Sequence, residues 1–251
     1  MESVDLKKIP SFAKDPEAAL AFYFDQGYHI EPGVFDADEI AAIKKAARNL
    51  PDYLNGSYIP TLNPHRLEDP FLKALAKKTL VEIMRLMVHG KVSGLQTQYF
   101  FGKPGTKGFA MHQDNFYVES NPDAFASSWN PLVDVSPKNG GLIVYPGSHR
   151  EPILPVDKFE EQQAAGQDKN ARREQVRLPE KYQPVSVVAP AGSAVFIHGH
   201  TVHSSHDNQT DTYREVLLCT YLRAGEKFRP GFSAKRNEVD VETMLVDKVG
   251  A

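Results

Sequence analysis

From Gly94 to about residue 225, the sequence is a series of short apolar segments, each ended by a turn containing glycine or proline. Short strands separated by such turns are typical of all-β sandwiches and barrels. We expect strands at residues 95–101, 109–118, 124–135, 141–145, 184–190, 193–198, 201–205 and 214–222. The pattern therefore predicts a jelly roll or a barrel as the core of the fold.

The sequence before this core, about residues 12–90, has helical rather than alternating periodicity. Helices are expected at residues 15–26, 36–50 and 71–88. Asp15 is a suitable N-cap for the first helix, and Gly27 is a suitable residue to end it. Residues 51–68, which are rich in proline, asparagine and tyrosine, are expected to form a surface loop. The chain is thus predicted to be mainly β, with N-terminal helices packed outside the jelly roll.

The composition argues against several classes of protein. The 251 residues carry a formal net charge of −3 with acidic and basic residues mixed throughout, so no nucleic-acid partner is expected. Cys219 is the only cysteine, which excludes an internal disulfide and a thiolate zinc cluster. Residues 1–10 contain no apolar segment suited to a signal peptide or a membrane anchor. We therefore expect one cytoplasmic domain, residues 1–251, without a membrane partner and with its oligomeric state open.

Two segments differ from the rest of the chain. Residues 157–183 are highly charged and poor in apolar side chains, which favours a mobile insertion or a lid. Residues 226–251 show no pattern that indicates a structure or a role. The first segment is a candidate for contact with a substrate, and the second carries no prediction.

His112 and Asp114 lie two positions apart inside the expected strand 109–118. Residues i and i+2 of a strand point to the same face, so we expect this imidazole and this carboxylate to converge. A second histidine from elsewhere would complete a 2-His-1-carboxylate site, which suits Fe(II) and leaves positions open for other ligands. His-x-Asp alone is a common pattern, so the hypothesis depends on a third ligand.

Residues 196–208 contain four histidines that could supply this ligand: His198, His200, His203 and His206. They follow Asp114 by roughly ninety residues, a separation that a barrel closes by pairing distant strands. Most of them are expected to be ordinary strand and turn residues. Arg214 then opens a strongly apolar strand, where a buried guanidinium needs a partner. That partner is either a protein carboxylate or the far carboxylate of a bound dicarboxylic acid.

Taken together, these motifs resemble those of the phytanoyl-CoA dioxygenase family of Fe(II)- and 2-oxoglutarate-dependent oxygenases. The motifs that carry the resemblance are His112-x-Asp114, His203-Ser-Ser-x-x-Asn208 and Arg214. Residues 139–149 are similar to another family segment, in which Gly-Gly precedes a short strand and a Pro-Gly-Ser-His turn. Residues 28–43 resemble the family's N-terminal entry, so the resemblance covers about residues 15–225.

The resemblance implies a double-stranded β-helix, which is a cupin-like jelly roll, as the core of the fold. It also implies a set of site residues. The implied Fe(II) ligands are His112, Asp114 and His203. The residues implied to contact 2-oxoglutarate are Arg214, Ser205, Trp129, Gln98 and Gln96. Arg214 would pair with the far carboxylate of this co-substrate, and Ser205 would help to hold it. His203 is preferred to His198 and His200 because only His203 has the Ser-Ser-x-x-Asn context and the family's spacing to the arginine.

The resemblance also implies a reaction. Fe(II), 2-oxoglutarate and O₂ would act together on a small-molecule substrate, with release of succinate and CO₂. Asp114 favours hydroxylation, because related halogenases replace this carboxylate with a small residue, while desaturation and ring closure stay open. The alternatives are a fatty acyl-CoA hydroxylase of the same family, a cupin-like metal-dependent non-oxygenase, and a metal-free binding protein in which the three ligands fail to converge.

The substrate is predicted to be a small polar metabolite, such as an amino acid, a phosphonate or an amino sugar. The candidate pocket residues are Tyr53, Tyr58, Asn63, His65, Asn115, Tyr117 and residues 157–183. Their polar and charged character favours a small polar molecule over a long acyl chain.

Overall fold

The computed structural model describes residues 1–158 and 174–246. The α-helices in these residues are α1 (Pro16–Gln26), α2 (Ala37–Ala47), α3 (Pro51–Leu54), α4 (Asp69–Leu75), α5 (Lys78–Met87), α6 (Asn115–Val118) and α7 (Thr243–Val246). Single turns of 3-10 helix lie at Leu6–Lys8, Pro64–Arg66, Pro122–Ala124 and Ser148–Arg150. None of the helices in the described residues is long and apolar enough to span a bilayer.

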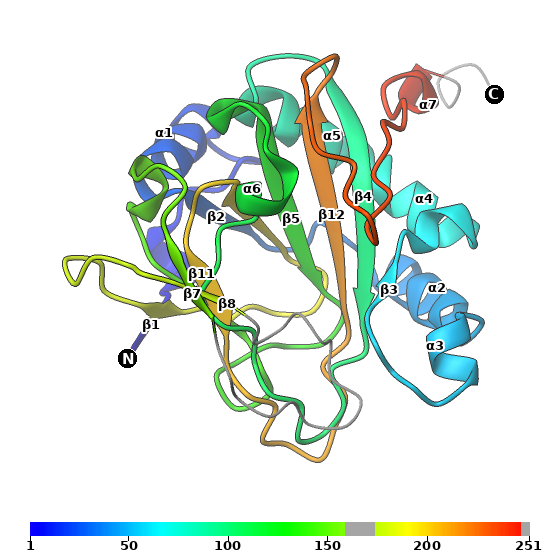
Figure 1. The fold of residues 1–251 in the computed structure, drawn as a ribbon. Helices are drawn as coiled ribbons and strands as arrows, with labels where there is room; N and C mark the ends of the chain where they lie inside the picture. Colours follow the sequence, from blue (N-terminus) through cyan, green and yellow to red (C-terminus); the bar gives the residue numbers. More distant parts are fainter. Residues whose placement is uncertain (159–173, 247–251) are drawn as a thin grey trace.

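Most of the described strands form two sheets that pack face to face (Figure 1), and two more form a separate ribbon. The order in the larger sheet is β2 (Tyr28–Glu31), β10 (Ala194–His198), β5 (Phe125–Pro131), β12 (Val216–Arg223), β4 (Val92–Phe100) and β3 (Thr61–Leu62). The order in the smaller sheet is β1 (Glu2–Ser3), β9 (Val185–Ser186), β6 (Leu142–Val144) and β11 (His203–Ser205). Among the described strands, β1 and β9 pair in parallel and the other pairs are antiparallel. This arrangement confirms the predicted jelly roll.

Side chains alternate between the two faces of the larger sheet, as the period of a strand requires. On the outer face, Tyr99, Leu217 and Tyr221 pack with the helices in one apolar cluster. Figure 1 shows α2, α3 and α4 beside β3 and β4, on the side away from the smaller sheet. On the inner face, Trp129 and Val195 belong to a second cluster that includes residues of the smaller sheet. The helices therefore flank the jelly roll, as the sequence predicted.

The first two helices begin at the residues that the sequence indicated. The Asp15 side chain accepts a hydrogen bond from the N–H of Ala18 and caps α1, which ends at Gly27 with a φ of 78°. A side chain at Gly27 would also collide with the His149 ring. Asp36 and Glu39 form a capping box at the start of α2. Local capping chemistry therefore determined both ends of α1 and the start of α2.

The single helix predicted at residues 71–88 is wrong, because two helices occupy this segment. Helix α4 ends at Leu75 and α5 begins at Lys78, with Lys77 between them in an extended conformation. The break allows Leu75 and Leu80 both to be fully buried beneath the sheet. It also places the Lys77 ammonium in an ion pair with Glu39 of α2. Packing against the curved sheet overrides the continuous helical pattern of the sequence.

The predicted surface loop at residues 51–68 is only partly a loop. It contains α3, the edge strand β3 and a turn of 3-10 helix at Pro64–Arg66. Strand β3 pairs with β4 through Thr61 and Leu62. A two-residue edge strand has too little sequence to produce a recognisable alternation, which is why the pattern missed it.

The predicted lid at residues 157–183 lies partly outside the described residues, which resume at Glu174. Its two described ends pair as a ribbon of β7 (Val156–Lys158) and β8 (Glu174–Val176). The N–H of Val176 also donates to the carbonyl of Met111, which ties the ribbon to the core. Closure of this segment over a substrate stays a prediction, as does the assignment of residues 1–251 to one domain.

Candidate functional site

His112 and His203 face each other across an antiparallel bridge. Each backbone N–H donates to the other residue's carbonyl at 3.0 Å, and the ring centroids are 4.2 Å apart. The Nδ1 atoms bond to the carbonyls of Ala110 (2.8 Å) and Thr201 (3.0 Å). A carbonyl can only accept, so Nδ1 carries the proton and Nε2 keeps its lone pair in each ring. The backbone therefore directs both Nε2 atoms as potential ligands toward the same point.

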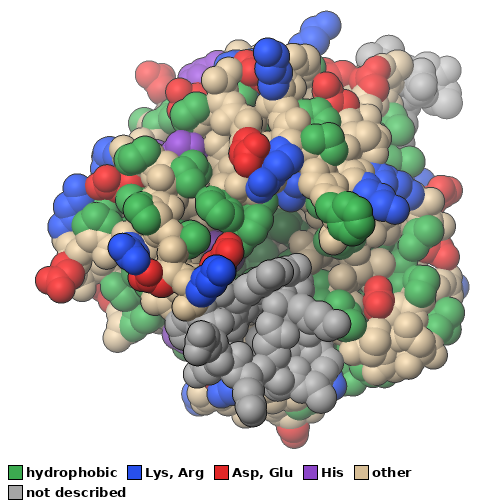
Figure 2. All heavy atoms as spheres, in the orientation of Figure 1, with side chains coloured by type: hydrophobic (Ala, Val, Ile, Leu, Met, Phe, Trp, Pro, Cys, Tyr) green, Lys and Arg blue, Asp and Glu red, His purple; other side chains and the backbone are tan. Residues whose placement is uncertain are grey.

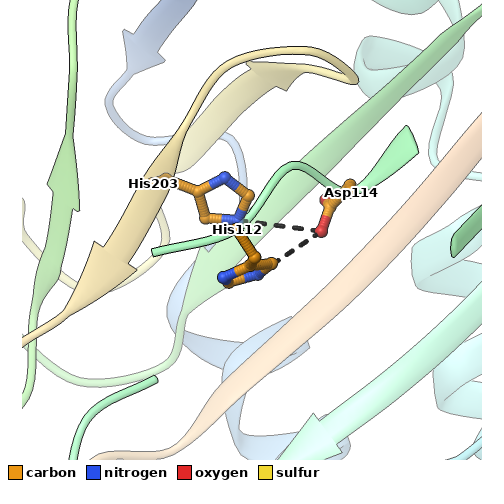
Figure 3. A group of neighbouring side chains, drawn as sticks. All are labelled: His112, Asp114 and His203. Atoms are coloured by element: carbon orange, nitrogen blue, oxygen red, sulfur yellow. Dashed lines mark ion pairs between the residues drawn. The ribbon is translucent and has the colours of Figure 1, made fainter. Parts of the chain in front are cut away.

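Asp114 brings the third potential ligand to this point (Figure 3). Its Oδ1 lies 3.6 Å from Nε2 of His112 and 3.7 Å from Nε2 of His203. Its Oδ2 accepts a hydrogen bond from the Ser127 hydroxyl at 2.7 Å. The three ligand atoms lie within 4.8 Å of one another, so the group could hold a single metal ion. The convergence that the sequence predicted for these residues is present.

The reason given for the convergence was wrong, because residues 109–118 are not a strand. His112 makes only the isolated bridge, Asp114 has helical φ and ψ of −59° and −36°, and α6 follows at once. The chain turns at Gln113, whose buried side chain bonds the carbonyl of His200 and the N–H of Leu154. These buried tertiary hydrogen bonds outweigh the local alternating pattern.

The electrostatics of the group suit a divalent metal. Burial and the neighbouring His203 lower the pKa of His112 to about 4, so the imidazole is neutral at pH 7. Burial raises the pKa of Asp114, but the two histidines and the Ser127 hydroxyl outweigh it and hold the pKa below its ordinary value. Two neutral nitrogens and one carboxylate are the donor set that Fe(II) oxygenases use.

These side chains line a cavity of about 650 Å³ between the two sheets. Figure 2 shows the surface hollowed near the centre of the view, over β5 and β12, with hydrophobic side chains on both sides. The other residues predicted for the site also line the cavity: Arg214, Ser205, Trp129, Gln98 and Gln96. Inner-face positions of β4, β5 and β12 supply one part of the cavity wall.

Arg214 is the least compensated charge in the cavity. It is 5% exposed, and no residue that the structure describes accepts a hydrogen bond from its Nε. Its guanidinium carbon lies 5.9 Å from the Phe100 ring centre and 5.8 Å from that of Trp129. Burial lowers its pKa to about 10, so it stays charged at pH 7. A buried cation without an anion indicates that a ligand supplies one.

Glycines make room beside this guanidinium. A Cβ at Gly102 would lie 3.1 Å from Nε of Arg214, and a Cβ at Gly140 would lie 3.4 Å from it. Ser205 lies in the same cavity wall, and its hydroxyl oxygen accepts a hydrogen bond from the N–H of Phe109 at 2.8 Å. The arrangement fits a small dicarboxylate that bonds Arg214 at one end and a metal at the other.

The other histidines of residues 196–208 lie away from the metal group. The His198 ring packs near Tyr23 and His149, and its Nε2 lies 3.5 Å from Asp123. The His200 Nε2 bonds the Asn115 amide at 3.1 Å. Both are satisfied structural residues, and the preference for His203 agrees with the geometry.

The predicted pocket residues were mostly wrong. Tyr117 and Glu174 line the cavity. The predicted residues that lie outside it are Tyr53, Tyr58, Asn63, His65 and Asn115. The tyrosines pack on Phe101 in the outer cluster, a contact that no sequence pattern indicated. His65 forms a hydrogen bond with Thr97 on the outer face of β4, so this polar side chain has a structural role.

Sequence reasoning missed the part of the cavity wall formed by residues 229–236. Arg229, Phe232 and Arg236 line the cavity, although they are remote in sequence from the metal group. This segment has no strand alternation or helical period. Two arginines flanking a phenylalanine and glycine were the only available signal, and that combination is common in ordinary loops.

The fold and this site together define an oxygenase that uses a metal and a dicarboxylate co-substrate. The family model described as "Phytanoyl-CoA dioxygenase (PhyH)" matches residues 23–216. The chain therefore belongs to the phytanoyl-CoA dioxygenase family and is an Fe(II)- and 2-oxoglutarate-dependent oxygenase.

Known proteins with similar sequences and structures agree with this membership. An ectoine dioxygenase of Stutzerimonas stutzeri (strain A1501) is 26% identical over 247 residues, covering 84% of this chain and 80% of the relative. The epimerase SnoN, solved with Fe3+, alpha ketoglutarate and nogalamycin RO, has a TM-score of 0.68 at 24% identity and covers 84% of both chains. The carbocyclase SnoK from nogalamycin biosynthesis has a TM-score of 0.71 at 19% identity, covering 92% of this chain and 91% of its own. The two structural similarities support the fold.

Proposed function

We propose that this chain is a hydroxylase of a small polar metabolite, with His112, Asp114 and His203 as its Fe(II) ligands. The single observation that carries the proposal is the convergence of these three groups in one cavity with Arg214, which has no ion pair with a described residue. The metal-free alternative required the three side chains to lie apart, and that expectation is wrong.

Each residue of the proposed site has a defined task. The carbonyls of Ala110 and Thr201 fix the histidine tautomers. Ser127 holds Oδ2 of Asp114, which leaves Oδ1 for the metal. Arg214 binds the far carboxylate of 2-oxoglutarate as a charge-assisted pair, while the Phe100 and Trp129 rings flank it and limit access of water.

O₂ would supply the oxidising equivalents at an Fe(II) ion held by His112, Asp114 and His203, and 2-oxoglutarate would supply two electrons. One oxygen atom would enter the substrate and the other would leave in succinate, with release of CO₂. The protein orients the substrate C–H bond toward the metal and excludes competing reactions. Asp114 supports hydroxylation because its carboxylate occupies the place that halide would need. SnoN and SnoK are named an epimerase and a carbocyclase, so product analysis is the measurement that distinguishes hydroxylation from these reaction types.

The substrate class is supported by the cavity wall and by one relative. The wall includes two glutamines, Gln96 and Gln98, together with Arg236. The similar protein from Stutzerimonas stutzeri is named for ectoine, a small polar molecule. We therefore propose a small polar metabolite as the substrate, and a fatty acyl-CoA stays the alternative. The cytoplasmic location expected from the sequence also stays a prediction.

The decisive test is anaerobic addition of Fe(II) and 2-oxoglutarate to the purified protein. We expect the weak visible charge-transfer band of the bidentate 2-oxoglutarate–Fe(II) chelate. Its absence at millimolar co-substrate would contradict the proposed function. The substrate class is then tested by succinate release with amino acids, phosphonates, amino sugars and acyl-CoAs, followed by mass spectrometry of the product. A gain of one oxygen atom supports hydroxylation, whereas a loss of two hydrogens indicates desaturation or ring closure.

A further inference from the structure

Residues 229–236 form a C-terminal strap along one wall of the cavity. The N–H of Arg229 donates to the carbonyl of Val118 at 2.6 Å. The side chain of Asn63 donates to the carbonyl of Ala234 at 2.7 Å. The side chain of Arg66 donates to the carbonyl of Lys235, also at 2.7 Å. The strap is therefore fixed by bonds to both sides of the cavity mouth.

Arg236 extends from this strap into the cavity wall. Its Nε donates to Oε1 of Gln96 at 2.8 Å, and its Nη1 donates to the carbonyls of Tyr117 (3.1 Å) and Arg229 (3.2 Å). No carboxylate of the described residues forms an ion pair with it, and its Nη2 makes no hydrogen bond to them. Among the described residues, neutral acceptors orient this half-buried guanidinium and no carboxylate is paired with it.

The neighbouring arginine of the strap differs. Arg229 forms an ion pair with Glu119 at 2.9 Å, and its other nitrogens donate to the carbonyls of Phe116 and Tyr117. Its charge and its hydrogen bonds are satisfied within the protein. Arg229 is thus a structural residue of the strap, whereas Arg236 is available to a ligand.

Two arginines of the cavity, Arg214 and Arg236, thus lack an ion pair with any described residue. If the proposed function is correct, one carboxylate of 2-oxoglutarate binds the metal and the other bonds Arg214. Asp114 attracts Arg236 at longer range, but this carboxylate is committed to the metal. Neither the co-substrate nor any carboxylate of the described residues is therefore an ion-pair partner of Arg236.

The strap also places an apolar group at the cavity. Phe232 is 99% exposed although it belongs to the cavity lining. Ile59 and Leu62 line the same cavity from the segment that leads into and includes β3. An aromatic ring left fully in water beside a binding cavity gains apolar contact when a ligand lies against it.

We propose that the substrate is a small organic anion, whose carboxylate or phosphoryl group bonds Arg236 while Phe232 covers its apolar part. This inference rests on the proposed function and narrows its substrate class. It favours amino acids, other carboxylic acids and phosphonates over neutral or cationic amino sugars. Arg236 is then a residue that determines specificity, held in place by Gln96.

The test uses the anaerobic complex of the protein with Fe(II) and 2-oxoglutarate. The probes are carboxylic acids with their primary amides, and phosphonates with their neutral diesters. Binding is measured by the change that each probe causes in the charge-transfer band. We expect anionic members to bind, each at least about tenfold more tightly than its neutral counterpart. Equal binding within the pairs, or binding by none of the anions, would overturn the inference.

Variants of the strap separate charge recognition from folding. Arg236→Gln should weaken binding of the anionic probes at least about tenfold and remove the preference within each pair. Arg236→Lys should keep part of that preference, because it keeps the charge. Lys235→Gln removes one positive charge from an exposed neighbouring position, and it should leave probe binding unchanged. Wild-type probe binding by Arg236→Gln would contradict the role of this residue.

Failure of the proposed function and failure of the substrate inference give different experimental results. If Fe(II) and 2-oxoglutarate give no band in the wild-type protein, the proposed function is wrong, and the substrate inference falls with it. If the band forms and only neutral probes perturb it, the oxygenase assignment stands and the anionic substrate is wrong. Affinity for 2-oxoglutarate in Arg236→Gln should stay within about twofold of wild type, because Arg214 provides the co-substrate contact.

Discussion

Buried charges on the two faces of the larger sheet differ in whether described residues form ion pairs with them. Arg214 and Glu215 are adjacent in sequence and are both almost fully buried, at 5% and 3% exposure. Arg214 faces the inner cavity and has no ion pair with a described residue. Glu215 is paired with Lys44 at 3.0 Å and Arg48 at 2.7 Å, and it accepts a hydrogen bond from Tyr99 at 2.8 Å.

This difference separates residues that serve stability from residues that serve binding. The partners of Glu215 lie on α2 and β4, so its carboxylate joins the helix layer to the outer face. A charge satisfied in this way contributes to folding. A buried charge without an ion-pair partner destabilises the folded state. Such a charge is typical of a binding site, where the ligand supplies the opposite charge. Inner-face substitutions should therefore alter binding, and outer-face substitutions should alter stability.

The largest effect is expected when each of the two candidate distal ligands, His203 and His198, is substituted separately. His203→Gln should weaken Fe(II) binding by more than about a hundredfold. Loss of a residue that only hydrogen-bonds a metal ligand already lowers metal affinity about 10–100-fold, and loss of the ligand itself should cost more. His198→Gln, the matched change near Tyr23, should leave Fe(II) binding within about twofold, because it lies outside the metal group. Anaerobic Fe(II) titration measures both, and similar losses in the two variants would refute the assignment of His203.

Arg214→Met should have the next largest effect. Loss of a buried charged donor should raise the dissociation constant for 2-oxoglutarate at least about thirtyfold. The thermal midpoint should stay the same or rise, since an uncompensated buried charge is removed. Titration of the charge-transfer band and thermal unfolding measure the two quantities. A stability loss without a loss of affinity would place Arg214 with the structural residues.

Glu215→Gln should show the reverse pattern. The free energy of unfolding should fall by about 1–3 kcal/mol, because Lys44 and Arg48 lose their carboxylate while both stay partly solvated. Affinity for 2-oxoglutarate should stay within about twofold. Denaturant unfolding compared with band titration tests both parts, and a large loss of affinity would erase the distinction between the two faces.

The pKa of Glu215 predicts that the stability of the folded state depends on pH. Burial raises the pKa of Glu215, but hydrogen bonds from Arg48, Tyr99 and Lys44 outweigh it, so the pKa of the folded state lies below its ordinary value of 4.5. Its stabilisation is therefore complete above that value and is lost as the pH falls below it. Unfolding measured between neutral and acidic pH should decline less steeply for Glu215→Gln than for wild type.

The smallest effect is expected at two neighbouring serines of β5. Ser127→Ala removes the hydroxyl that donates to Asp114 at 2.7 Å, and it should weaken Fe(II) binding about tenfold. Ser128 faces the other way and donates to Asn130 at 2.6 Å. Ser128→Ala should leave Fe(II) binding unchanged and lower only stability. Equal Fe(II) affinity in the two variants would show that the Ser127 contact does not support the metal ligand.

Local chemistry was enough to predict much of this protein from its sequence. Turns with glycine and proline separated the strands, and the Asp15 cap and Gly27 bounded α1. The eight residues predicted for the metal and co-substrate all line one cavity: His112, Asp114, His203, Arg214, Ser205, Trp129, Gln98 and Gln96. The resemblance of the motifs to the family implied this set, and such motifs are recognisable because the chemistry of the site tolerates few substitutes.

The tertiary structure decided what depends on contacts between distant residues. Burial of Gln113 turned the chain before Asp114, although the local pattern predicted a strand. Packing of Leu75 and Leu80 divided one expected helix into two. Hydrogen bonds from Asn63 and Arg66 brought the strap beside the metal group, and with it Arg236. Sequence patterns report short-range preferences, whereas these outcomes depend on partners that the chain brings together only when it folds.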